Sequence, residues 1–82
     1  MPRFHFNVHD GYSKSDHEGT ELPDWKAART EAIRLAGMLI LDEAERIARE
    51  PDWHMDVADE RGLILFRLDL TIVEAPVTQG WR

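Results

Sequence analysis

One long stretch with helical periodicity, residues 25–49, constrains the fold of this 82-residue chain more than any other feature. Asp24 precedes it as an N-cap, because its carboxylate can accept an amide hydrogen bond from the first turn and suits the positive end of the helix dipole. Glu50-Pro51 ends the helix, because proline disfavours helical geometry in the residue before it. The acidic segment before the helix is therefore explained by helix initiation. The apolar stripe at helical spacing consists of Trp25, Ala28, Ala32, Leu35, Ala36, Leu39 and Ile40.

The segments on either side of this helix alternate between apolar and polar residues, which is typical of half-buried strands. Residues 3–10 alternate strictly, and residues 17–22 predict a weaker second strand after a polar loop. After the helix, residues 53–59 and 63–73 flank a turn that ends in glycine, and this pattern predicts a β-hairpin. In the last strand, one face carries Ile64, Phe66, Leu68, Leu70 and Ile72, and the opposite face carries Leu63 and Leu65.

These elements predict an α+β fold class: a two-layer β-β-α-β-β domain with one long helix packed on a four-stranded, mainly antiparallel sheet. Two strand orders remain open, 2-1-3-4 and 2-1-4-3, with the strands numbered along the chain. Residues 1–73 are predicted to form the single domain and residues 74–82 a flexible C-terminal tail. The predicted core consists of Phe4, Phe6, Val8, Ala28, Ala32, Leu35, Leu39, Met55, Val57, Ile64, Phe66, Leu68 and Leu70.

Composition and charge weigh against several classes of function. The chain has no cysteine, which removes disulfides, thiolate metal sites and cysteine nucleophiles together. Its formal net charge of -6 disfavours binding to nucleic acids and to anionic membranes. The N-terminus has no apolar signal-peptide region, and the longest apolar stretch, residues 35–41, is far below the roughly 20 residues that cross a bilayer. We therefore expect a cytoplasmic protein that is not attached to a membrane.

Exposed apolar residues indicate a surface for self-association. A straight helix over residues 25–49 is about 38 Å long and overshoots strands of six or seven residues. Gly37 in the middle of this helix suggests that something packs closely there. We predict a homodimer, formed by helix against helix around Gly37 or by sheet against sheet. The possible interface residues are Leu63, Leu65, Met38 and Leu41.

Polar residues on the sheet indicate a second candidate surface. His5 and His9 lie on one face of the first strand, about 13 Å apart, which is too far for both to bind one metal ion directly. Either can approach His54, with Asp56 or Asp10 nearby, if the first and third strands are neighbours, and imidazole with carboxylate suits zinc or nickel. A solvated face without a metal is the first expectation, and nucleic-acid, metal or ligand binding is the alternative. The possible polar binding face is His5, His9, His54 and Arg67.

The sequence contains no pattern typical of catalysis. It has no nucleophile elbow, no glycine-rich phosphate loop and no helix with a histidine-glutamate metal motif. A chain with one helix also leaves little room for a cleft. We therefore predict a non-enzymatic interaction or regulatory module that acts as a homodimer, without catalytic residues or a cofactor. A protein partner other than a second copy remains compatible with the same apolar surfaces.

Four segments together resemble a family of short bacterial proteins that is described as a domain of unknown function. The segments are "MPRFHFNVHDG", "DHEGTELPD", "AARTEAIRLAG" and "VADERGLILFRL". They cover about residues 1 to 70, and the family occurs mainly in soil- and plant-associated alphaproteobacteria. The resemblance implies a small cytoplasmic domain and supplies no activity, so no functional residue is carried over from it. The segment "LAGMLIL" and the tail "VTQGWR" depart from the family pattern, which puts the packing of the helix in doubt.

Overall fold

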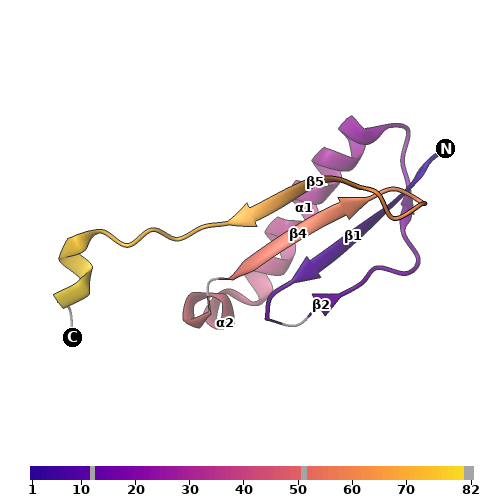
Figure 1. Ribbon diagram of the computed structural model, residues 1–82. Coiled ribbons are helices and arrows are strands. Elements are labelled where there is room, and N and C mark those ends of the chain that lie inside the picture. Colours follow the sequence, from indigo (N-terminus) through magenta and orange to yellow (C-terminus); the bar gives the residue numbers. More distant parts are fainter. Residues whose placement is uncertain (12, 51, 81–82) are drawn as a thin grey trace.

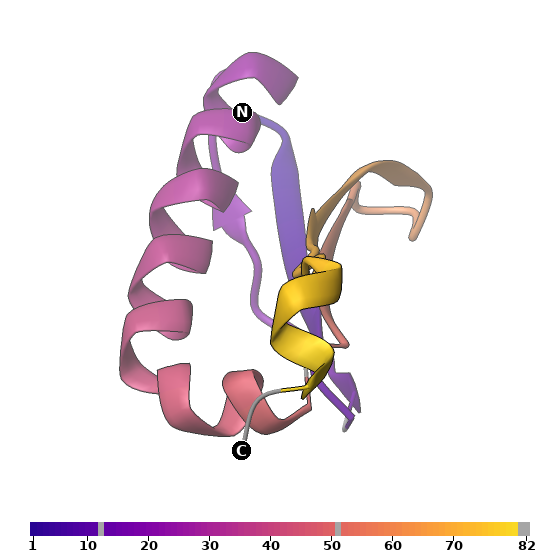
Figure 2. The same cartoon turned by 90° about the vertical axis from the view of Figure 1, so that its left-hand side faces the viewer.

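The computed structural model of the protein describes residues 1–11, 13–50 and 52–80 and has two layers, a helix layer on one face of a sheet (Figures 1 and 2). The predicted α+β class and element order are confirmed. Neither helix within these residues is long and apolar enough to cross a bilayer. Along the chain the elements are β1 Arg3–His9, β2 Ser13–Lys14, β3 Thr20–Glu21, α1 Trp25–Asp42, α2 Ala44–Arg49, β4 Trp53–Ala58, β5 Ile64–Leu70 and the 3-10 turn η1 Pro76–Gly80.

The sheet is antiparallel throughout, with the order β2-β1-β4-β5 and with β3 also paired to β1. Of the two strand orders that the sequence left open, the structure has 2-1-3-4, so β4 lies beside β1 and β5 forms an edge. The register between β1 and β4 pairs His5 with Ala58 and His9 with His54. This register sets which polar side chains meet on the face turned away from α1.

The second strand is shorter and more divided than predicted. In place of one strand over residues 17–22, two strands of two residues each pair with β1. β2 lies opposite Val8 and His9, in the segment predicted as a polar loop, and β3 lies opposite Arg3 and Phe4. Between them, the Asp16 carboxylate accepts the N–H of Phe6 at 3.2 Å. A side chain therefore replaces a backbone partner in the middle of this edge.

The core lies between α1 and the inner face of the sheet. Alternate residues of β1 and β4 are buried there. The fully buried α1 residues are alanines, whose small side chains allow close packing of the helix on the strands, and Leu35, Leu39 and Ile40 pack against the core partly buried. Trp53 and Ile47, at 2% and 4% exposed, belong to this core and were not on the predicted list. The buried cluster is Phe4, Phe6, Val8, Ala28, Ala32, Ala36, Ile47, Trp53, Met55 and Val57.

The prediction of one continuous helix over residues 25–49 is wrong at Glu43, where the helical segment divides into α1 and α2, although α2 ends at Arg49 as predicted. Glu43 leaves helical geometry with φ -117° and ψ 24°, and its N–H closes α1 on the carbonyl of Leu39. Figure 2 shows α2 turning from the line of α1 toward the sheet. The bend carries Ile47 onto the core and brings the Arg46 guanidinium to the buried carboxylate of Asp10 at 2.9 Å. A straight helix would have passed the end of the strands with its last turns unpacked.

A β-bulge changes which faces the first residues of β5 occupy. The pairing with β4 shifts between Val57 and Ala58, so that Ile64 pairs with Ala58 and lies on the open face, 58% exposed. The prediction that Ile64 belongs to the core is therefore wrong. Leu65, predicted on the opposite face, instead lines a groove on the helix side together with Phe66. One inserted residue exchanges inward and outward positions, because side chains alternate along a strand.

The segment after β5 leaves the body of the molecule. The strand predicted to reach residue 73 ends at Leu70. Residues 71–80 extend away from the sheet and finish in η1 (Figure 1). The exposed apolar side chains on this segment include Ile72, Val73 and Val77. The division into a domain of residues 1–73 and a flexible tail stays a prediction.

Candidate functional site

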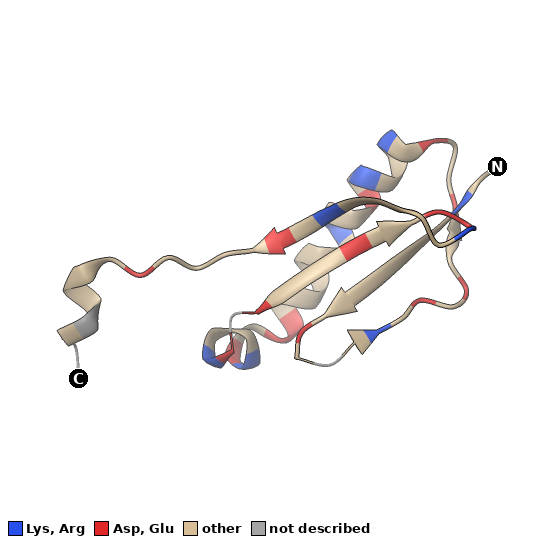
Figure 3. Cartoon of the chain, in the orientation of Figure 1, with Lys and Arg blue, Asp and Glu red and all other residues tan. Residues whose placement is uncertain are grey.

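The open sheet face, the side turned away from α1, is polar. We define it by residues of three neighbouring strands whose registers place them on one side. All four residues of the predicted polar face lie on it, together with carboxylates of β4 and β5. In Figure 3, β4 carries an acidic segment and β5 carries a basic and an acidic one side by side. Ile64 adds one exposed apolar side chain to this face, and its polar members are His5, Asn7, His9, His54, Asp56, Arg67 and Asp69.

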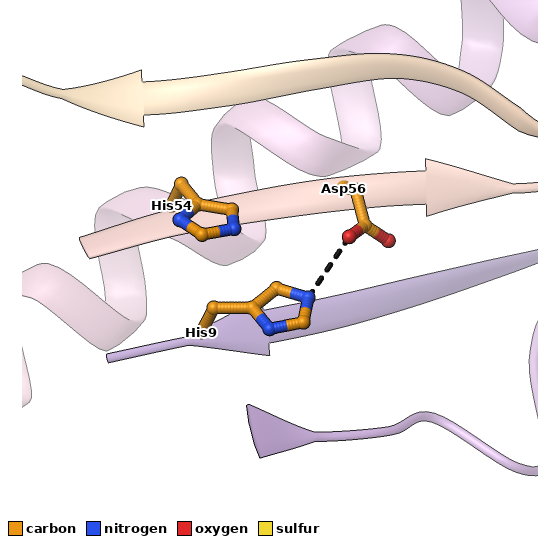
Figure 4. Close-up of side chains that lie close together, drawn as sticks. All are labelled: His9, His54 and Asp56. Carbon is orange, nitrogen blue, oxygen red and sulfur yellow. Dashed lines mark hydrogen bonds and ion pairs between the residues drawn. The ribbon is translucent and has the colours of Figure 1, made fainter. Parts of the chain in front are cut away.

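Three of these residues form one compact cluster, His9, His54 and Asp56 (Figure 4). His9 and His54 are cross-strand partners, and their rings stack with centroids 4.5 Å apart and planes inclined by 15°. His9 Nε2 donates to Asp56 Oδ2 at 2.9 Å. One potential ligand atom from each residue lies within 4.8 Å of the other two. We call this group the His-His-Asp cluster.

Neighbouring polar groups hold two members of the His-His-Asp cluster in place. The amide Nδ2 of Asn7 donates to Asp56 Oδ1 at 3.0 Å, which leaves Oδ2 turned to His9. The hydroxyl of Ser13 on β2 lies 3.1 Å from Nδ1 of His9. In contrast, Nδ1 of His54 is buried and has no hydrogen-bond partner among the residues that the structure describes. Buried polar atoms are nearly always paired, so this nitrogen is the unsatisfied position of the face.

Arg67 lies beside the cluster but is engaged elsewhere. Its guanidinium contacts the Asp69 carboxylate at 2.8 to 3.0 Å. The hydrogen bond with Asp69 raises the pKa of Arg67, and the hydrogen bond from Arg67 lowers the pKa of Asp69. Both groups therefore stay charged across the physiological range. The Arg67 cation is held by its own strand neighbour while Asp56 turns to His9.

His5 lies at the other end of the face and serves the loop instead. Its Nδ1–H donates to the carbonyl of Asp16 at 2.7 Å. The Asp16 carboxylate accepts the N–H groups of Gly19 and Phe6, at 3.0 and 3.2 Å. Burial alone would raise the pKa of Asp16, but these amides and the nearby His5 outweigh it and lower the pKa. Sequence reasoning missed Asp16, since a lone aspartate in a polar loop gives no sign of its partners.

A groove with a mainly apolar lining lies between β5 and the first half of α1. It has a volume of about 740 Å³ and is lined mainly by apolar side chains. Two carboxylates reach it, and both are used in local structure: Asp24 caps α1 through the N–H of Ala27, and Asp59 accepts the N–H of Leu63 in the turn. We call it the β5 groove. Its apolar lining is Pro2, Phe4, Trp25, Ile33, Leu65, Phe66 and Leu68.

The four predicted interface residues lie in different places. Leu65 lines the β5 groove, and Leu63 is exposed in the turn before β5. Met38 and Leu41 are 64% and 79% exposed on α1, and neither lines the groove. Gly37 beside them has no atom within 4 Å of the position where a Cβ would stand, so within the described chain nothing packs on it. The sequence expected close packing there.

Comparison with known proteins assigns the chain to a family but supplies no relative of known function. No curated protein and no solved structure matches the chain. Residues 3–71 match the model of a family described as a domain of unknown function, DUF6894. The matched range begins at the first residue of β1 and ends one residue after β5, so it contains the open sheet face and, apart from Pro2, the lining of the β5 groove. The resemblance drawn from the sequence is thereby confirmed, and the chain belongs to the DUF6894 family.

Proposed function

We propose that this protein is a non-enzymatic interaction module that works as a homodimer, formed by antiparallel pairing of β5 with β5 of a second copy. The observation that carries the proposal is the outer edge of β5. This strand ends the sheet, and among the described residues no other strand pairs with its outer side. An uncovered edge presents a row of backbone N–H and C=O groups to another chain.

The residues of β5 are complementary to themselves in one register. With a twofold axis through Leu68, Arg67 of each copy lies opposite Asp69 of the other, and Phe66 lies opposite Leu70. Opposite charges directly across an antiparallel pair are favourable, each by about 0.2–1 kcal/mol. An axis through Arg67 or through Asp69 would place like charges face to face. Of these three registers, only the one centred on Leu68 pairs opposite charges on one face and apolar residues on the other.

The β5 groove supports the same arrangement. A twofold axis perpendicular to the sheet places both α1 helices on the same side of a continuous sheet. The grooves of the two copies then face each other across the paired strands, and Trp25, Ile33 and Leu65 approach the apolar lining of the partner. Burial of this surface contributes about 25 cal/mol per Å² of apolar area removed from water. The edge supplies the register, and the groove supplies the apolar contact.

Sedimentation equilibrium over a hundredfold range of concentration tests this proposal. We expect wild-type protein to dimerise in buffer that contains a chelator. Arg67→Asp places two pairs of like charges across the interface and should raise the dimer Kd roughly tenfold or more. Adding Asp69→Arg to Arg67→Asp reverses both charges, restores the complementary pairs and should bring the Kd back toward wild type.

A helix variant serves as the matched control. Met38→Glu adds a charge on the exposed side of α1 and should leave the Kd unchanged. A wild-type protein that stays monomeric at every concentration contradicts the homodimer. Dissociation by Met38→Glu, with no effect of Arg67→Asp, moves the interface to the helix and rejects the β5 edge.

A further inference from the structure

We propose that the His-His-Asp cluster is a binding site for one divalent transition-metal ion, with Zn²⁺ the best match to its donors. The ligands would be one imidazole nitrogen each from His9 and His54 and one carboxylate oxygen from Asp56. The site lies on the open sheet face, and the β5 groove lies on the helix side of the sheet. The proposal therefore stands or falls separately from the homodimer.

The geometry of the sheet brings the three donors together. β1 and β4 pair so that His9 and His54 are directly opposite, and Asp56 follows two residues later on the same face of β4. The three donor atoms span at most 4.8 Å. A tetrahedral ion with bonds of about 2.0–2.1 Å needs donors roughly 3.3 Å apart. Because an imidazole binds an ion in its ring plane, the stacked His9 and His54 rings must also rotate out of their stack so that one nitrogen of each points at the same ion.

The donor types select the metal. Two imidazoles with one carboxylate form a mixed nitrogen and oxygen set, which Zn²⁺ and its neighbours in the first transition series accept. Mg²⁺ and Ca²⁺ prefer six or more oxygen donors and find only the Asp56 carboxylate in this cluster. Three protein ligands also leave a position on a tetrahedral ion for water or a partner's side chain.

The surrounding contacts resemble the outer shell of a metal site. Ligating histidines usually bond a second group through their other nitrogen, and ligating carboxylates are themselves hydrogen-bonded. Here Ser13 lies at Nδ1 of His9, and Asn7 holds Oδ1 of Asp56. Without an ion, the neutral His9 ring donates its Nε2–H to Asp56. With an ion bound to Nε2, the ring proton would lie on Nδ1 and be donated to the Ser13 hydroxyl. That hydroxyl can serve as donor or acceptor, so both states are satisfied.

His54 supplies an independent indication. Its buried Nδ1 has no hydrogen-bond partner among the described residues, whereas His9 and Asp56 are bonded to each other. A ring flip exchanges its nitrogens with ring carbons, and no hydrogen bond at Nδ1 fixes the orientation of this ring among the described residues. Asp69, opposite His54 on β5, adds negative potential and holds the Arg67 cation. The Asp69 carboxylate thereby compensates the positive charge that Arg67, opposite Asp56, brings to this face.

Isothermal titration of untagged protein with ZnCl₂ tests the site, with MgCl₂ and CaCl₂ as controls. We expect one Zn²⁺ per chain and no heat from Mg²⁺ or Ca²⁺ beyond dilution. His9→Ala and His54→Ala should each weaken Zn²⁺ binding at least tenfold, and Ser13→Ala about tenfold through the lost outer contact. His17→Ala, at an exposed histidine outside the cluster, should bind as wild type does.

Visible absorption of the Co²⁺-loaded protein gives a second readout. A mixed nitrogen and oxygen site of low coordination number should produce ligand-field bands that His54→Ala abolishes, while far-ultraviolet circular dichroism shows that the variant is folded. Absence of heat with Zn²⁺ at tens of micromolar protein overturns the proposal. Binding that survives both histidine substitutions, or that His17→Ala removes, overturns it equally.

Discussion

The two edges of the sheet are treated in opposite ways. The outer edge of β1 is closed by three successive partners: β3 at Arg3 and Phe4, the Asp16 carboxylate at Phe6, and β2 at Val8 and His9. The outer edge of β5 has no such cover within the described chain. Free sheet edges invite pairing with other chains, and proteins usually cover or charge them. The proposed β5–β5 homodimer would cover the edge that the chain itself leaves bare.

The closed edge is held by polar contacts that depend on one another. Arg3 donates to the carbonyl of Glu18 at 2.8 Å and pairs with Glu21, while His5 and Asp16 bond across the middle of the loop. The bare edge of β5 carries its charged pair, Arg67 and Asp69, within one strand. The polar groups at the β1 edge find all these partners within the chain. In the proposed homodimer, Arg67 and Asp69 would pair with Asp69 and Arg67 of the second copy instead of with each other, so no charge would lose its partner.

The largest effect is expected from Gly19→Ala in the loop that closes the β1 edge. Gly19 has φ +74°, and an added Cβ would stand 2.8 Å from Arg3 Cγ and 2.9 Å from His5 Cε1. Strain at positive φ costs about 1–2 kcal/mol, and the clash adds to it, so we expect a loss of about 3 kcal/mol. Urea unfolding measures the change.

Gly62→Ala, in the turn before β5, is the matched control for Gly19→Ala. Its φ is +86°, but an added Cβ meets nothing within 4 Å. We therefore expect a loss of only about 1–2 kcal/mol, from backbone strain alone. Equal losses in the two variants would mean that the loop does not pack on β1 as the structure has it.

A smaller loss is expected from Asp16→Asn, which weakens the partner of the Phe6 and Gly19 N–H groups. Hydrogen bonds to a charged acceptor contribute about 1.5–3 kcal/mol, so we expect a loss of about 2 kcal/mol at neutral pH. Because folding lowers the pKa of Asp16, its contribution is complete above the ordinary aspartate value of about 3.9 and disappears as pH falls through the lowered pKa.

Urea unfolding at neutral pH and in acid separates this effect from a general one. The difference between wild type and Asp16→Asn should shrink as the pH falls below 4. Glu18→Gln removes an exposed carboxylate from the same loop and should change stability by less than about 0.5 kcal/mol. A loss that is the same at every pH would contradict the assignment to the Asp16 charge.

Much of the fold followed from pattern. Strict alternation predicted β1 and β4, Asp24 was correctly predicted as the N-cap, and the spacing of the helix alanines predicted the covered face. The predictions that failed depended on how long the elements are relative to one another and on how the strands pair in three dimensions. A straight helix would be longer than the strands, and the bend at Glu43 turns its last residues back toward the sheet. The bulge at Val57 and Ala58 leaves no recognisable pattern in the sequence.

The candidate site was only half predictable for the same reason. The histidines of the open face could be named from alternation, but bringing His9 to His54 required the strand order that the sequence left undecided. Asp56 was named only as a residue near them, while Asn7 and Ser13 received no role until the register placed them. Asp10 and Arg46, which join β1 to α2, depend on a helix bend that periodicity does not show.

The smallest effect, and the only gain in stability, is expected from Gly37→Ala on the exposed side of α1. An added Cβ there meets nothing within 4 Å, and alanine in a helix interior is about 0.5–1 kcal/mol more favourable than glycine. We expect urea unfolding to show this gain and sedimentation equilibrium to show an unchanged dimer Kd. If the copies instead met through α1 around Gly37, the added methyl group would hold the helices apart and raise the Kd. An unchanged Kd therefore supports the bare edge of β5 as the place where copies meet, and a raised Kd supports the outer face of α1.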